Sequence, residues 1–196
     1  MKSDDEVIDE IIEAYKPQIQ IPESKPEKQF FLCPVGLVGA GKTTVLKPLS
    51  EKLNLVRISG DEIRKILKEH GYGYDLTWEI GQKIVTELVR QGYSIAHDTD
   101  CATPRTQEYL AKLAQEVVAK IIWIHINPPE EFIINKLKNF KHTWLFKNGG
   151  EAIENYLSRK PLHENLSMPF AYTFDTSRGD LNEQIEEGLV AIQSAL

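Results

Sequence analysis

A glycine-rich segment near the start of the chain constrains its fold more than any other feature. Residues 36–43 read Gly-Leu-Val-Gly-Ala-Gly-Lys-Thr, which matches the phosphate-binding pattern G-x-x-x-x-G-K-[ST]. The apolar residues 30–35 precede the segment, and the helix-compatible residues 44–49 follow it. This pattern works where a strand leads through a loop into a helix, because backbone N–H groups and the positive end of the helix dipole then face a phosphate. The sequence therefore predicts a strand, a phosphate-binding loop and a helix over residues 30–53.

The residues of this loop have separate expected roles in binding a nucleoside triphosphate. Lys42 can reach the β- and γ-phosphates, and the Thr43 hydroxyl can ligate Mg²⁺. The predicted nucleotide-binding residues are Gly36, Gly39, Ala40, Gly41, Lys42, Thr43 and Thr44. We therefore expect ATP and Mg²⁺ as cofactors.

Composition narrows the class of protein further. The chain has 196 residues and a formal net charge of −6, so it suits one domain and gives no overall signal for wrapping a long nucleic acid. No apolar run reaches transmembrane length, and the first residues lack the apolar core of a signal peptide. Cys33 and Cys101 lie far apart without metal-ligand spacing, which favours a reducing compartment. We therefore expect a cytoplasmic protein without a membrane partner.

Strand-like and helix-like segments alternate along the chain. Residues 1–28 read as an N-terminal helix over 4–15 and a proline-containing linker, and residues 29–196 read as one domain. The expected strands are 30–35, 55–59, 93–97, 120–126 and 171–174. The expected helices are 4–15, 42–53, 61–69, 77–91, 104–119, one from about 130, 151–159, and one that Asp180 and Glu183 start as a capping box. This alternation predicts an α/β fold with a parallel sheet.

Two prolines fit this assignment poorly. Pro34 lies at the end of the expected central strand, where its missing N–H is unfavourable. Pro48 lies about two turns into the helix after the loop, where a proline is expected to kink it.

Asp61 and Arg64 are the first candidates for chemistry outside the loop. Asp61 follows the second expected strand, at the sheet edge where such folds bind ligands. A carboxylate there can accept the proton of a hydroxyl that attacks the γ-phosphate, and Arg64, one helical turn later, can hold an anionic group. The alternative is that Asp61 caps the following helix and Arg64 is an exposed surface residue.

The third expected strand ends in His97-Asp98-Thr99-Asp100. Asp98 is the candidate Mg²⁺ ligand, and Asp100 is the alternative; either carboxylate could instead form a turn. Arg105 starts the next helix, which is the unfavourable end for a cation, so a role in the substrate cleft is expected.

The region 136–160 is rich in cations and is the expected lid over the phosphates. The candidates for the lid cation are Lys136, Lys138, Lys141 and Arg159, of which Arg159 is preferred, and Gly149-Gly150 is the expected hinge. An exposed basic helix face is the alternative for any of the lysines. The aromatic residues of 140–146 could stack on a base or sugar, although a place in the core is the simpler interpretation.

Together these segments resemble the P-loop kinases of the group that contains polynucleotide 5′-hydroxyl kinase, chloramphenicol phosphotransferase and zeta toxin. The resemblance covers about residues 30–178 and rests on G-L-V-G-A-G-K-T-T, S-G-D-E-I-R, H-D-T-D with a following P-R, N-P-P-E-E and F-D-T-S. It implies that Asp61 is the base, that Arg64 binds the acceptor and that Asp98 is the acidic end of strand three. It also implies a three-layer fold with a five-stranded parallel sheet in the order 2-3-1-4-5. Where such kinases usually carry an arginine after P-P-E-E, this chain has Lys136.

Three functions fit these residues. The first is an ATP-dependent kinase that phosphorylates a hydroxyl of a small-molecule or nucleotide-like acceptor, with Lys42, Asp61, Arg64 and Arg159 as catalytic residues and Thr43 and Asp98 as Mg²⁺ ligands. The second is a nucleotide-dependent switch or regulatory ATPase without such an acceptor, in which the N-terminal helix docks a partner. The third is a toxin-like kinase. Net acidity argues against a long nucleic acid as the substrate.

Overall fold

Five parallel strands form one sheet in the order β2-β3-β1-β4-β5. The computed structural model describes residues 2–140 and 145–196. The strands are β1 Phe30–Val35, β2 Val56–Ser59, β3 Ile95–Asp98, β4 Lys120–Ile126 and β5 Phe170–Phe174. The expected fold class and strand order are thus confirmed.

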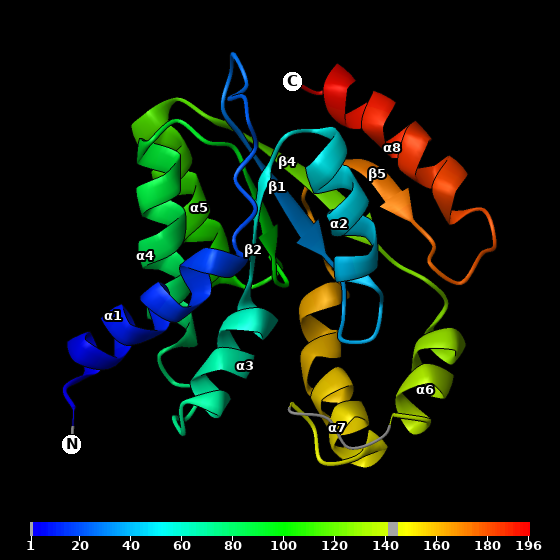
Figure 1. Cartoon of the computed structure of the whole chain (residues 1–196). Helices are drawn as coiled ribbons and strands as arrows, with labels where there is room; N and C mark the ends of the chain where they lie inside the picture. The colour runs from blue at the N-terminus through cyan, green and yellow to red at the C-terminus, as the bar shows by residue number, and fades with distance from the viewer. Residues whose placement is uncertain (1, 141–144) are drawn as a thin grey trace.

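Helices cover both faces of this sheet and make it the middle layer of three (Figure 1). The helices are α1 Asp4–Tyr15, α2 Lys42–Lys52, α3 Gly60–Glu69, α4 Thr77–Arg90, α5 Pro104–Val117, α6 Glu130–Lys138, α7 Gly149–Arg159 and α8 Leu181–Ser194. α2 and α8 pack on one face, whereas α4 and α5 pack on the other, and each side has its own apolar core. None of the helices in the described part of the chain has the length and apolarity that a membrane crossing requires.

The central strand accommodates Pro34 because its ladder with β3 has already ended. β1 pairs with β3 through Phe31 and Leu32 only, while its pairing with β4 continues to Val35. The carbonyl of Pro34 accepts a hydrogen bond from the Cys101 N–H at 2.9 Å, on the side of β3. Because the N–H and C=O of one residue point to the same edge of a strand, the missing N–H of Pro34 faces this side too and removes no ladder bond. α2 likewise continues through Pro48 to Lys52.

The predicted capping box at Asp180 is wrong. Asp180 precedes α8, but its side chain accepts no bond from the first turn, since its backbone (φ −99°, ψ 26°) lacks the extended conformation of such caps. Its carboxylate instead accepts hydrogen bonds from the Gln184 amide at 2.7 Å and from the Arg178 guanidinium.

The N-terminal segment lies against the rest of the protein. α1 packs on α3 and α4 and buries Val7, Ile11, Ile12 and Tyr15. A short 3₁₀ turn, Lys16–Gln18, follows, and residues 19–29 then run to β1 without regular secondary structure. Near the end of this stretch the Gln29 side chain donates hydrogen bonds to the carbonyls of Val89 and Tyr93.

Candidate functional site

The loop 36–41 connects β1 to α2 and bends at positions where a side chain would not fit. Gly41 has φ 97°, in the left-handed region, and a Cβ on Gly36 would lie 2.7 Å from the Ile126 carbonyl oxygen. Ala40 is fully buried, so it presents only its backbone to a ligand. On the side of β5, Thr176 donates a hydrogen bond to the Ala40 carbonyl at 2.6 Å. The loop therefore packs closely against the end of β4 and is hydrogen-bonded to the segment after β5.

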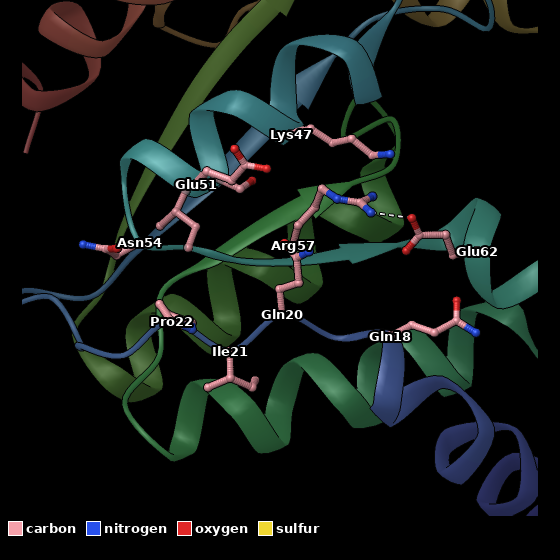
Figure 2. Close-up of a pocket in the computed structure, with 11 residues that line it drawn as sticks. Gln18, Gln20, Ile21, Pro22, Lys47, Glu51, Asn54, Arg57 and Glu62 are labelled. Carbon is pink, nitrogen blue, oxygen red and sulfur yellow. Dashed lines mark hydrogen bonds and ion pairs between the residues drawn. The ribbon is translucent and has the colours of Figure 1, made fainter.

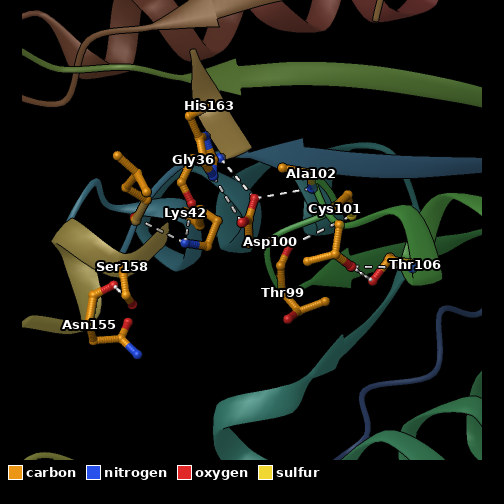
Figure 3. A network of polar contacts seen from close by, with 12 residues as sticks. Gly36, Lys42, Thr99, Asp100, Cys101, Ala102, Thr106, Asn155, Ser158 and His163 are labelled. Carbon is orange, nitrogen blue, oxygen red and sulfur yellow. Dashed lines mark hydrogen bonds and ion pairs between the residues drawn. The ribbon is translucent and has the colours of Figure 1, made fainter. Parts of the chain in front are cut away.

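Lys42 lies inside the curve of this loop (Figure 3). Its Nζ donates hydrogen bonds to the carbonyls of Gly36 at 2.7 Å and Leu37 at 3.1 Å. Burial lowers the pKa of the Lys42 ammonium below its ordinary value, while nearby carboxylates, of which Asp100 is the strongest, act in the opposite direction. The cation is therefore held by the same loop whose N–H groups would bind phosphate.

Thr43 and Asp98 bring two oxygen donors together beside Lys42. The Thr43 hydroxyl donates to Asp98 Oδ1 at 3.1 Å, and the Asp98 side chain is 2% exposed. Burial raises the pKa of Asp98 above its ordinary value, while Arg57 and Thr43 act in the opposite direction. A hydroxyl and a carboxylate fit Mg²⁺, which commonly takes one or two protein oxygens and completes its shell with phosphates and water. Consistent with so small a ligand set, the described residues contain no cluster of three or more His, Cys, Asp or Glu that could hold a metal.

Asp100, the alternative metal ligand, is already occupied by contacts within the protein (Figure 3). Its Oδ1 accepts from the N–H groups of Gly36 and Ala102, both at 3.3 Å, and its Oδ2 contacts His163 Nε2 at 3.0 Å. Burial alone would raise the pKa of Asp100, but His163 and the positive charge of Lys42 outweigh it, and the pKa lies below its ordinary value. Asp100 thus ties the start of the loop to the segment after α7, whereas Asp98 faces Thr43.

Asp61 lies on the first turn of α3 and Arg64 on the next, and both line the same cleft as the loop. The N-cap of α3 is Ser59, whose Oγ accepts the Glu62 N–H at 3.4 Å, so the capping alternative for Asp61 is wrong. Arg64 Nη1 donates to Asp61 Oδ1 at 2.7 Å, and the Asp61 side chain is 54% exposed. The carboxylate therefore faces open space beside the phosphate loop.

The cleft has a volume of about 760 Å³ and a strongly cationic wall. Lys136 lines it and donates to the Gly39 carbonyl at 3.1 Å. Arg159 lines it as well, and within residues 2–140 and 145–196 its guanidinium has no ion pair. Lys138 does not line the cleft, and Lys141 lies outside the described residues.

Gly149 and Gly150, the expected hinge of the lid, are the first two residues of α7. Gly149 is buried, and a Cβ there would lie 2.4 Å from the Leu137 carbonyl oxygen, so the close packing of α7 on α6 requires a glycine. The hinge stays a prediction.

Aromatic side chains complete the cleft on two sides. Phe140 and Phe146 border it but also belong to the core beneath α2, which agrees with the simpler interpretation of these two residues. On the opposite side the Arg105 guanidinium lies 4.5 Å from the Trp78 ring centroid and donates to Glu79 at 3.1 Å. Arg105 thus lines the cleft as expected, with Trp78 as a partner that sequence reasoning missed.

Two further polar residues of the site were not identified from the sequence. Arg57 donates to Asp98 Oδ2 at 2.6 Å, and a single arginine within an otherwise apolar strand was the available signal. His163 has no such signal, because it meets Asp100 only through the fold.

Comparisons with known proteins agree with this architecture. A family model described as an AAA domain matches residues 32–143, more than half of the chain. A search of curated proteins found no match.

Several solved structures share the fold. A structure of the PezAT chromosomal toxin–antitoxin system of Streptococcus pneumoniae is 15% identical, with a TM-score of 0.60 over 98% of this chain and 97% of that one. The Mycobacterium tuberculosis APS kinase bound to AMPPNP and APS is 13% identical, with a TM-score of 0.57 over 86% and 99%. Shikimate kinase from Bacteroides thetaiotaomicron is 18% identical, with a TM-score of 0.51 over 86% and 97%. At these identities the likeness concerns the fold alone.

Proposed function

We propose that this chain, which belongs to the AAA domain family, is a P-loop kinase that transfers phosphate from ATP to a hydroxyl group. The acceptor in this proposal is a small molecule or a nucleotide-like compound. One observation carries it: the loop with Lys42 and Thr43 shares a single cleft with Asp61 and Arg64. A donor site and a base next to an open space are what transfer to a second substrate requires.

In the donor half, the chain's own groups bind the phosphates. The loop N–H groups other than those of Gly36 and Ala40, which are bonded within the protein, hold the β- and γ-phosphates together with the start of α2, with Thr44 at the cleft wall. Lys42 leaves the two loop carbonyls and bonds phosphate oxygens instead. Thr43 and Asp98 would hold Mg²⁺, which would supply positive charge against the phosphates.

In the acceptor half, Asp61 takes the proton of the acceptor hydroxyl as its oxygen attacks the γ-phosphorus. The bond from the γ-phosphorus to the bridging oxygen breaks, and ADP leaves with that oxygen. Arg64, which is already bonded to Asp61, orients the acceptor. Arg159 and Lys136 approach the transferred group from the lid side and stabilise its negative charge.

We also propose that the kinase acts in the cytoplasm. Cys33 and Cys101 are both buried free thiols, which supports a reducing environment. The net charge of −6 supports small acceptors over long nucleic acids.

The test combines transfer from γ-labelled ATP with a pair of Asp→Asn variants. Sugars, nucleosides, 5′-hydroxyl oligonucleotides and phenicol or aminoglycoside antibiotics serve as acceptors. Asp61→Asn is expected to lower transfer by about 10²- to 10⁴-fold, with ATP affinity nearly unchanged, because only proton removal is lost. Asp75→Asn makes the same charge change at an exposed position outside the cleft and is expected to leave transfer unchanged.

Two outcomes would contradict the proposal. Wild-type turnover in Asp61→Asn would show that Asp61 is not the base. ATP hydrolysis that a protein partner stimulates, with no labelled product from any acceptor, would favour the regulatory ATPase instead.

A further inference from the structure

Asp98, the proposed Mg²⁺ ligand, is held by a second residue besides Thr43. Arg57 lies on β2, the strand next to β3, and its Nη1 donates to Asp98 Oδ2 at 2.6 Å. Its Nη2 donates at the same time to Glu62 Oε1 on α3. The Arg57 side chain is 17% exposed, so two carboxylates share one largely buried guanidinium. The orientation of Asp98 therefore depends on what holds Glu62.

Glu62 is held by the N-terminal helix. The Tyr15 hydroxyl donates to Glu62 Oε2 at 3.0 Å, and it accepts the N–H of Ser59 at 3.0 Å. Tyr15 is the last residue of α1 and is fully buried. One hydroxyl thus joins α1 to the junction between β2 and α3, the turn from which Asp61 also projects.

The side of Arg57 away from Asp98 is not tightly packed. A separate cavity of about 520 Å³ lies there, lined by Arg57 and Glu62 together with Gln18, Gln20, Ile21 and Pro22 of the segment after α1 (Figure 2). On this side the guanidinium borders open space and has no packed side chains among the described residues to hold it. The hydrogen bonds to Asp98 and Glu62 must therefore fix the guanidinium.

α1 itself is firmly placed. Its apolar residues belong to the core beneath α4 and α5. At its surface Glu10 accepts hydrogen bonds from Tyr72 at 2.8 Å and Lys2 at 2.7 Å, and Asp9 pairs with Lys83 at 2.7 Å. A helix docked in this way can position the groups that its last residue contacts.

We propose that α1 contributes to the nucleotide site. Tyr15 positions the Asp98 carboxylate toward Thr43 and Mg²⁺ through its contacts with Glu62 and, from there, with Arg57. Tyr15, Glu62 and Arg57 are positioning residues, since none of them touches the phosphates in this scheme. The inference rests on the proposed function for the role of Mg²⁺. Loss of such an indirect contact to a metal ligand typically weakens metal binding about 10- to 100-fold.

The experiment measures the affinity for a non-hydrolysable ATP analogue with and without Mg²⁺, in the absence of any acceptor. In wild type, Mg²⁺ is expected to tighten binding. Tyr15→Phe removes one hydroxyl and keeps the ring, and it is expected to cut this Mg²⁺-dependent gain about 10-fold while the Mg²⁺-free affinity stays within about twofold. Glu62→Gln keeps an acceptor for Tyr15 but weakens the pair with Arg57, and it is expected to act in the same direction.

Tyr109→Phe is the matched control. The Tyr109 hydroxyl is partly buried and bonds the Gln82 carbonyl and the Thr86 hydroxyl between α4 and α5, and the substitution keeps the ring that contacts Trp78. A purely structural role for Tyr15 predicts that the two tyrosine variants behave alike, whereas the positioning role predicts that only Tyr15→Phe loses the gain.

The outcomes separate the two proposals. If Mg²⁺ tightens binding to wild type and to Tyr15→Phe and Glu62→Gln equally, the positioning role is overturned and the proposed function stands. If Mg²⁺ has no effect on nucleotide binding to wild type, the proposed metal site fails and the inference fails with it.

Discussion

His97 is a buried histidine that should make the protein lose stability in mild acid. It lies on β3 with its side chain 7% exposed, and neither ring nitrogen has a hydrogen-bond partner among the described residues. Burial lowers the pKa of His97 from 6.5 to about 4. Between these two values the unfolded chain binds a proton that the folded protein does not, so the free energy of unfolding falls as the pH falls.

The size of the effect follows from the two pKa values. Each pKa unit corresponds to about 1.4 kcal/mol, so His97 destabilises the folded protein by about 3 kcal/mol at low pH, and most of this destabilising contribution is reached by about pH 4.5. Above about pH 7 the imidazole is neutral in both states and the contribution disappears.

Urea unfolding between about pH 7.5 and about pH 4.5 measures this loss, with wild type compared with two variants. His97→Gln keeps a polar side chain but cannot titrate in this range, so its free energy of unfolding should fall less than that of wild type, by about 2–3 kcal/mol. His97→Leu should be equally flat and also more stable at neutral pH, because no unpartnered polar atoms remain. Parallel curves for wild type and His97→Gln would refute the reasoning.

Two further predictions concern packing and the lid. Gly188→Ala should lower the free energy of unfolding by about 1–3 kcal/mol, because its Cβ would lie 2.5 Å from Cζ of the buried Phe174 ring. Val190 is exposed on the same helix, so Val190→Ala should change the free energy of unfolding by less than about 0.5 kcal/mol in the same urea titration. Arg159→Ala should lower kcat by about 10³-fold in the transfer assay, and Lys138→Ala, outside the cleft, should not; equal effects of the two would contradict a specific lid cation.

The strands and helices could be predicted because their signals are local, whereas the strand order was implied only by the family resemblance. The loop 36–43 fixed one strand and one helix, and the apolar run 120–126 marked a strand that is covered on both faces. All expected bounds lie within two residues of the observed ones. β3 starts later than expected, at Ile95, because the Ser94 side chain accepts the Phe30 N–H at 2.9 Å in place of a backbone ladder bond.

The partners of the site residues could not be predicted, because they depend on tertiary contacts. Asp98 and Asp100 have the same residue type and similar surroundings in the sequence. Only the approach of His163 to one and of Arg57 to the other distinguishes them. The predicted cap at Asp180 failed for a local reason, because its backbone is not extended and the Gln184 amide, four residues later, donates to its carboxylate.

The place of β1 in the centre of the sheet has a consequence for biosynthesis. β1 comes first among the described strands, yet the neighbours that pair with it begin only at Ile95 and Lys120, so one of its edges stays open until about half of the chain has been made and the other for longer. Parallel pairing across such long separations raises contact order and slows folding. An apolar strand with open edges can meanwhile pair with another chain. We therefore expect refolding to be slow, and its yield to fall as protein concentration rises.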